Sequence, residues 1–332
     1  MSLKPLQSSL LCLLVALSAC GGNDDGLPLF VDPIDTQQPT FSLAVSDAPV
    51  DGLSDVILCF SSITLTGESD DLVMQVGDAD FGITANDLCL DDTGNIVPNA
   101  VGINLLEYKG SEFLSLVNDY TIEAGHYAQI NLGMTDGSYA VDKLDYSKTP
   151  IRVPSNEIEL NGFSAVENTD VGFTVEFDLR KALTAPEGQT GYILQSDGIR
   201  IVNNQQAGDI NGLVSETLLI NNLCEPLADI HGNPAAVYLY QGTQLDIDTL
   251  ADNDGSEGVA PYASSTVYFD SSQTLYPFEI GFVPFGSYTV ALSCNISDDP
   301  EMDDEVSFLD VKEVTIDENK PEGSVDFEEG YE

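Results

Sequence analysis

The sequence has no tryptophan, two histidines and few basic residues. Ten Lys and Arg face 56 Asp and Glu, which gives a formal net charge of −46 over 332 residues. A chain this acidic repels nucleic acid and anionic lipid head groups. Its histidines, His126 and His231, lie in no H-E-x-x-H pattern, and there is no G-x-S-x-G motif. We therefore expect a protein that is not an enzyme and does not bind nucleic acid.

After residue 20 the chain also lacks an apolar run long enough to span a bilayer. The amino terminus has a shorter one, from Leu10 to Ala16, preceded by Lys4, which is typical of a secretory signal peptide. The residues that follow, Leu17-Ser18-Ala19-Cys20, resemble the lipobox of bacterial lipoproteins. That resemblance implies a signal peptide over residues 1–19 and acylation of Cys20, with palmitate among its acyl chains. An ordinary signal peptide with a chance cysteine is the alternative.

Residues 20–39 read as a flexible tether, because they are rich in Gly, Asp, Pro and Gln and show no periodicity. The residue after Cys20 is Gly21 and not Asp. By resemblance to proteobacterial lipoproteins, this implies an anchor in the outer membrane. Whether the protein faces the periplasm or the cell surface stays open.

Four cysteines remain after the signal peptide and Cys20 are set aside: Cys59, Cys89, Cys224 and Cys294. Four cysteines allow three pairings. Two lie in each half of the mature chain, so Cys59–Cys89 and Cys224–Cys294 is the most economical choice, and disulfides are stable outside the cytoplasm. A metal site is the weaker alternative, since neither pair has C-x-x-C spacing.

Short runs rich in Val, Ile, Phe and Tyr, separated by Gly, Asn and Asp, predict antiparallel strands. In the first half the strands are expected at 41–45, 56–60, 63–65, 72–76, 127–132, 158–160, 171–177 and 199–202. In the second half they are expected at 210–219, 236–240, 266–269, 277–282, 287–294, 311–316 and 324–327. Two brief helices are expected, at 111–118 and 178–183. The class is therefore all-β, with two tandem antiparallel sandwiches that are Ig-like or transthyretin-like.

This pattern divides the chain into the signal peptide 1–19, the tether 20–39, a first domain 40–206, a second domain 207–328 and an acidic tail 329–332. Three segments of the first domain carry a resemblance to a known family: FSLAVSDAPVDGLSDVILCFSSITL, INLLEYKGSEFLSLVNDYTIEAGHYAQINLGM, and VGFTVEFDLRKAL with YILQSDGIRIV. Together they resemble the bacterial domain-of-unknown-function family 4382, found in exported proteins and lipoproteins. The family has no established reaction, so the resemblance implies architecture and export. Asp47, in its Ser-Asp-Ala-Pro element, is expected to set a turn by accepting backbone N–H bonds.

In the second domain, Phe285-Gly286-Ser287-Tyr288-Thr289-Val290 is similar to a turn and strand of transthyretin-like or carboxypeptidase-regulatory-like sandwiches. Such domains act as stalks, spacers or binding modules. The likeness is confined to six residues.

Calcium is the candidate ligand for the acidic loops. Asp252, Asp254 and Glu257 lie within six residues, and calcium takes six to eight oxygen ligands. The EF-hand register fails, because aligning Gly255 with the loop glycine places Leu250 at the first ligand position. Solvated acidic loops, adapted to salty water, are the competing interpretation.

The expected function is that of a lipid-anchored outer-membrane protein that acts as a binding, adhesion or structural module, without a required cofactor. Its expected partners are the membrane, through the lipid, and an envelope protein or polysaccharide. The alternatives are a calcium-dependent module for a polysaccharide or protein, and a carboxylate-based hydrolase.

Overall fold

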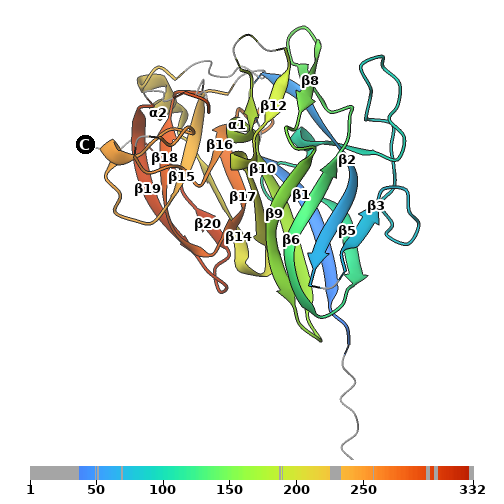
Figure 1. Cartoon of the computed structure of the whole chain (residues 1–332). Coiled ribbons are helices and arrows are strands. Elements are labelled where there is room, and N and C mark those ends of the chain that lie inside the picture. Colours follow the sequence, from blue (N-terminus) through green and yellow to red (C-terminus); the bar gives the residue numbers. More distant parts are fainter. Residues whose placement is uncertain are drawn as a thin grey trace, which may run out of the picture. The chain divides into compact units, whose positions relative to one another are not determined.

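The computed structural model describes residues 37–48, 50, 52–68, 70–186, 188, 190–224, 233–256, 258–296, 300–302 and 306–328. The predicted signal peptide, Cys20 and most of the predicted tether lie outside these residues. Residues 37–332 form one compact unit that contains two β-sandwiches (Figure 1). Among the described residues, no helix has the length and apolar character needed to cross a membrane.

The smaller sheet of the first sandwich has the strand order β13-β10-β1-β5. Its strands are β1 (Thr40–Ala48), β5 (Leu114–Thr121), β10 (Asp170–Asp178) and β13 (Ile199–Asn203). The alternation of Phe41, Leu43 and Val45 predicts one apolar face for β1, and all three side chains are fully buried. The Phe41 ring stacks on Phe163 of the opposite sheet, with centroids 5.4 Å apart.

The larger sheet has the order β11-β12-β8-β7-β2-β6-β9, and β3 and β4 also pair with β2. Its strands are β2 (Leu53–Gly67), β3 (Leu72–Gln75), β4 (Val101–Asn104), β6 (Gly125–Met134), β7 (Tyr139–Asp142), β8 (Lys148–Arg152), β9 (Glu157–Ala165), β11 (Leu183–Thr184) and β12 (Tyr192–Leu194). Val56 and Leu58 of β2 join the main core between the two sheets. Ile57 and Cys59, which alternate with them, lie on the outer face of the sheet in a separate small apolar cluster.

The second sandwich has a three-stranded sheet of order β17-β14-β20 and a four-stranded sheet of order β16-β15-β18-β19. Its strands are β14 (Ala207–Leu213), β15 (Ala235–Gln241), β16 (Ala263–Val267), β17 (Pro277–Pro284), β18 (Gly286–Ser293), β19 (Phe308–Ile316) and β20 (Glu322–Ser324). Side chains from both sheets, among them Ile210, Phe278 and Val290, bury a core separate from that of the first sandwich. The predicted division of the chain at residue 207 stays a prediction, since one compact unit holds both cores.

Helices are few, as the sequence predicts, but one of the two expected helices is wrong. The expected helix at 178–183 exists as α1 (Leu179–Ala182), whereas the one at 111–118 is replaced by strand β5. Its apolar residues fit either period, and backbone pairing with β1 selects the strand. The strand expected at 210–219 is also too long, because β14 ends at Leu213 and α2 (Glu216–Asn221) follows. Short 3-10 turns complete the set: η1 (Leu105–Glu107), η2 (Ser196–Gly198), η3 (Asn204–Gln206) and η4 (Ile247–Thr249).

Most strand pairs are antiparallel, as expected, but three pairs are parallel: β1 with β10, β8 with β12, and β14 with β20. Parallel neighbours need a long crossover between them. Between β1 and β10 the chain builds β5 and most of the opposite sheet before it returns. The parallel pairing therefore places the end of β1 beside the end of β10.

Candidate functional site

The first candidate site is a cavity of about 600 Å³ on the outer face of the nine-stranded sheet, which we call the stapled pocket. Alternation along β8 places Lys148, Pro150 and Arg152 on one face of the strand. Tyr139 of β7 lies opposite Pro150 and shares that face. The Lys148 ammonium lies 4.2 Å from the centre of the Tyr139 ring. An aromatic ring and two cationic side chains thus meet in one cavity.

A disulfide holds the loop that walls this pocket. Cys59 of β2 is bonded to Cys89, with the two Cα atoms 5.8 Å apart. Next to the bond, the Leu90 N–H donates to the Gly137 carbonyl over 3.3 Å. Gly137 has a φ of +103°, and a Cβ there would lie 2.9 Å from the Leu90 nitrogen. The close approach of the two loops therefore requires glycine at residue 137.

The rim of the stapled pocket carries three carboxylates, of Asp91, Asp92 and Asp136. Asp91 Oδ1 accepts hydrogen bonds from the Thr93 hydroxyl at 2.7 Å and from the backbone N–H of Asn95 at 2.8 Å. The bond from Thr93, followed by that from Asn95, lowers the pKa of Asp91 to about 2. Asp91 therefore stays ionised and holds the turn of its own loop.

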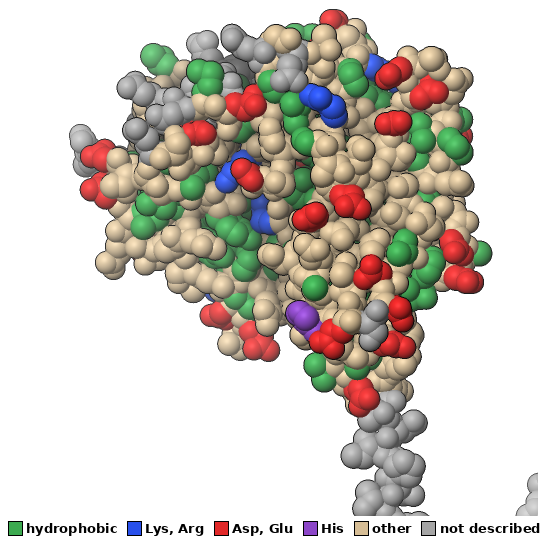
Figure 2. Space-filling model, in the orientation of Figure 1, with side chains coloured by type: hydrophobic (Ala, Val, Ile, Leu, Met, Phe, Trp, Pro, Cys, Tyr) green, Lys and Arg blue, Asp and Glu red, His purple; other side chains and the backbone are tan. Residues whose placement is uncertain are grey.

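Basic side chains are concentrated in the first sandwich. Seven of the ten Lys and Arg residues lie between positions 109 and 200. Figure 2 shows the basic side chains of one face mainly in its upper half, where Figure 1 has β8, β12 and α1. Tyr139, Lys148 and Arg152 lie in no motif that the sequence predicts to be functional. The available signal was Lys-x-x-x-Arg in a predominantly acidic chain, although no strand was predicted over these residues.

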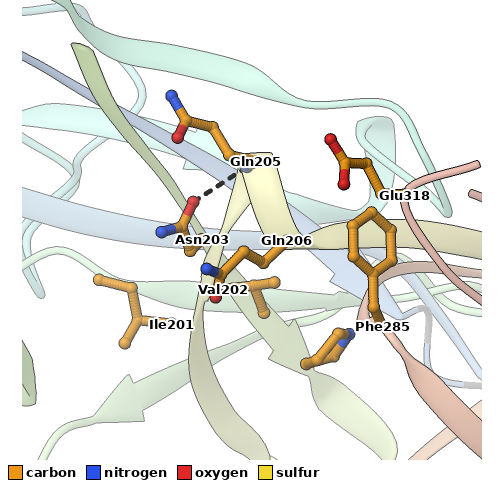
Figure 3. A pocket seen from close by; sticks show the side chains of 8 residues that line it. Ile201, Val202, Asn203, Gln205, Gln206, Phe285 and Glu318 are labelled. Carbon is orange, nitrogen blue, oxygen red and sulfur yellow. Dashed lines mark hydrogen bonds between the residues drawn. The ribbon is translucent and has the colours of Figure 1, made fainter. Parts of the chain in front are cut away.

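A second cavity, of about 570 Å³, lies where the two sandwiches meet, and we call it the junction pocket. The end of β13 and η3 form one side of it, and Phe285 and Glu318 of the second sandwich lie on the other. Figure 3 shows Asn203 and Gln205 on one side, Phe285 and Glu318 on the opposite side, and Gln206 between them. Of the described residues that line this pocket, Glu318 alone is charged.

Two amides of the junction pocket are oriented by one hydrogen bond each. Asn203 Oδ1 accepts the Gln205 N–H at 2.9 Å, which caps η3 (Figure 3). Gln205 Nε2 in turn donates to the carbonyl of Asp170 at 2.8 Å. Within the described part of the chain, Asn203 Nδ2, Gln205 Oε1 and the Gln206 amide make no hydrogen bond.

A buried acidic cluster formed by Asp47, Glu176 and Asp178 lies near the contact between the sandwiches. The Asp178 carboxylate accepts the backbone N–H of Ser264 at 2.7 Å and the Ser264 hydroxyl at 3.2 Å, so it ties β10 to β16. Glu176 pairs with Arg200 at 3.6 Å, which is too long for a hydrogen bond. Burial raises the pKa of Glu176 to about 8, although the Arg200 charge opposes this rise.

Asp47 does not have the role that the sequence suggested. Neither of its carboxylate oxygens accepts a hydrogen bond, and the side chain is fully buried. Burial raises the pKa of Asp47 well above its usual value, and the charges of Glu176 and Asp178 raise it further. The expectation of a turn held by this carboxylate is therefore wrong. Tertiary packing, which the local motif does not reveal, places Asp47 inside the protein.

The disulfide prediction is confirmed, since the structure joins Cys59 to Cys89 and Cys224 to Cys294. The second bond connects the segment after α2 to the end of β18, with Cα atoms 5.0 Å apart.

The calcium site stays a prediction, because Glu257 lies outside the described residues. Asp252 Oδ1 accepts the Gly255 N–H at 3.1 Å, and Asp254 Oδ2 accepts the Ser256 N–H at 3.2 Å. Across the described ranges, no group of three or more His, Cys, Asp or Glu residues has the arrangement of a metal site. The lipidation of Cys20 also stays a prediction, since that residue is not described.

Two comparisons with known proteins identify no relative that supports a fold or a function for this chain. No curated protein matches the sequence. Among solved structures, a leucine-rich repeat protein from Bacteroides thetaiotaomicron VPI-5482 is similar at 10% identity and a TM-score of 0.18, over 88% of this chain. The chain spans about a quarter (26%) of that protein's chain, and the TM-score is too low to support an argument about fold.

A family model does match the first sandwich. The matched segment, residues 38–196, extends from just before β1 to just after β12 and includes every residue of the stapled pocket. The model is described as a domain of unknown function, as the resemblance of the three quoted segments implied. Residues 38–196 of this chain therefore match the model of the DUF4382 family.

Proposed function

We propose that this protein is a lipid-anchored module of the bacterial outer membrane that binds an envelope component in the stapled pocket and catalyses no reaction. The observation that carries the proposal is the pocket itself. It is a cavity of about 600 Å³, within the size range of small-ligand sites, and an aromatic ring and two cations line it. Its loop is held by a disulfide, so the site is organised before a ligand arrives.

The cellular address is supported by the sequence and by the disulfides. Leu17-Ser18-Ala19-Cys20 resembles a lipobox, and Gly21 follows it where an acidic residue would favour the inner membrane. Disulfides persist in the periplasm and outside the cell and are rare in the cytoplasm. Each sandwich has one such bond.

The lining of the stapled pocket supports binding without catalysis. The described residues that line it include neither histidine nor cysteine, and the one serine among them, Ser138, accepts the backbone N–H of Cys59 at 2.9 Å. A nucleophile needs a base within hydrogen-bond reach, and within the described residues the Ser138 hydroxyl makes no hydrogen bond to such a group. Lys148 and Arg152 are instead suited to polar contacts with a bound ligand.

The anchor is tested with the variant Cys20→Ser. We expect the wild-type protein to incorporate radiolabelled palmitate and to fractionate with the outer membrane, and the variant to lose both properties. A single acyl chain gives reversible binding and several give a stable anchor, at about 0.8 kcal/mol per buried CH₂. A variant that still carries palmitate and stays in the outer membrane contradicts the anchor.

Binding is tested by the retention of the purified mature protein on washed envelope fragments. The double substitution Lys148→Gln/Arg152→Gln should lower retention at least tenfold, whereas Lys312→Gln in the second sandwich serves as the matched control. Equal retention of all three proteins contradicts the stapled pocket as the binding site. Protease treatment of the fragments then tells whether the retained component is a protein or a polysaccharide.

A further inference from the structure

We propose that the junction pocket is a second binding site, and that its ligand is a neutral saccharide chain. This inference rests on the lining of that pocket and not on the proposed role of the stapled pocket. Three amide side chains, of Asn203, Gln205 and Gln206, line the cavity together with Phe285. No Lys or Arg is present among the lining residues that the structure describes.

The amides of Asn203 and Gln205 are fixed at one end and open at the other. Because Asn203 Oδ1 is used to cap η3, its Nδ2 group remains as a donor. Because Gln205 Nε2 donates to the Asp170 carbonyl, the Gln205 Oε1 atom remains as an acceptor. Gln206 offers both a donor and an acceptor. A side chain locked by its own bond loses less conformational freedom when a ligand binds.

The opposite side of the pocket supplies apolar surface. Phe285 is partly buried against the second core, and its N–H donates to the Gln206 carbonyl at 2.9 Å, which holds the two sides together. Figure 3 shows the Phe285 ring across the pocket from Asn203 and Gln205. An aromatic ring provides a flat apolar face to a ligand whose other edges are polar.

A sugar ring matches this combination of groups. Each of its hydroxyls both donates and accepts hydrogen bonds, which fits a wall that offers donors and acceptors within a few residues. Its C–H face can lie against the Phe285 ring. An anionic ligand is disfavoured, because Glu318 and the chain's net charge of −46 repel it and no cation in the lining compensates. The volume of about 570 Å³ lies within the range of small-ligand pockets.

The test is calorimetric titration of the full mature protein with neutral hexasaccharides, namely maltohexaose, cellohexaose and xylohexaose, and with hexagalacturonate as an acidic comparator. We expect at least one neutral probe to bind with a dissociation constant below 1 mM, and the acidic probe to bind at least tenfold more weakly. The proposal is overturned if no neutral probe binds below 1 mM, or if the acidic probe binds as well or better.

Matched variants locate the site. Asn203→Asp keeps the oxygen that caps η3 but removes the donor, and Gln206→Ala removes an exposed side chain with no hydrogen bond of its own. Each should weaken binding of the neutral probe at least tenfold with an unchanged melting temperature. The control Gln129→Ala, on the exposed face of β6, should bind like the wild type. Equal affinity in Asn203→Asp, Gln206→Ala and wild type overturns the assignment, whereas Lys148→Gln/Arg152→Gln, which tests the stapled pocket, should leave this binding unchanged.

Discussion

Each sandwich has one disulfide, but the two bonds hold different kinds of structure. In the first sandwich, Cys59–Cys89 fastens a long loop to the outer face of a sheet and so makes a pocket. In the second, Cys224–Cys294 connects the segment after a short helix to the end of a core strand. The first sandwich also holds seven of the ten basic residues, and the second holds Lys312 and Lys320. This contrast supports the proposal that ligand recognition lies mainly in the first sandwich.

The largest expected effect separates the two disulfides. The bonds close loops of 30 and 70 residues, and chain entropy gives upper values of about 3.6 and 4.4 kcal/mol. We therefore expect Cys224→Ala/Cys294→Ala to lower the free energy of unfolding more than Cys59→Ala/Cys89→Ala does. Retention on envelope fragments should show the reverse order, because Cys59→Ala/Cys89→Ala releases the loop that walls the stapled pocket. Urea unfolding and the retention assay measure the two effects. The same order of the two variants in both assays would contradict different roles for the two disulfides.

The next effect concerns pH and the buried acidic cluster. Burial raises the pKa of Glu176 from its usual 4.5 to about 8, so the folded protein binds this proton more tightly than the unfolded chain. The resulting stabilisation is complete below pH 4.5 and is lost as the pH rises through 8. Between pH 5 and pH 8 we expect a loss on the order of 3 kcal/mol. Glu176→Gln should remove this part of the pH dependence from the urea-unfolding profile, and the exposed control Glu159→Gln should not. A wild-type stability that rises with pH would contradict this reading.

A smaller effect tests how firmly the sandwiches are coupled. Ser264→Ala removes a hydroxyl donor from the buried Asp178 carboxylate and leaves the backbone N–H bond in place. Loss of one such donor costs about 1–2 kcal/mol. We expect one calorimetric unfolding transition for the wild type and a broader or split transition for the variant. Ser256→Ala, in an exposed loop, is the control. Two separate transitions already in the wild type would show that the coupling is weak.

The smallest expected effect is that of calcium. If the acidic surface is general adaptation to salt, NaCl should raise the melting temperature by screening, and calcium should add only what its ionic strength explains. A specific site would add a saturable stabilisation of about 2.7 kcal/mol at a hundredfold excess over the dissociation constant. We expect the first behaviour, and no difference between Asp254→Ala and the wild type. A calcium-specific rise that Asp254→Ala removes would instead establish a site in the second sandwich.

The sequence was sufficient where a residue's role follows from its own neighbours. Phe41, Leu43 and Val45 alternate with smaller or polar residues, and this period of two is enough to predict a strand with a buried face. The disulfide pairing followed from the position of two cysteines in each half of the chain. The family resemblance likewise rested on contiguous segments, and the family model matches the same region.

Only the tertiary structure decided which distant segments meet. The period of residues 111–118 fits helix or strand, and antiparallel pairing with β1 selects the strand β5. The local sequence predicts that Asp47 sets a turn. The parallel pairing of β1 with β10 instead places it near Glu176 and Asp178 in the interior. Both pockets combine side chains whose proximity depends on strand order, on one disulfide and on the contact between two sandwiches. The periodicity of a strand is visible in its own sequence, whereas the segment with which it pairs depends on the free energy of the whole fold.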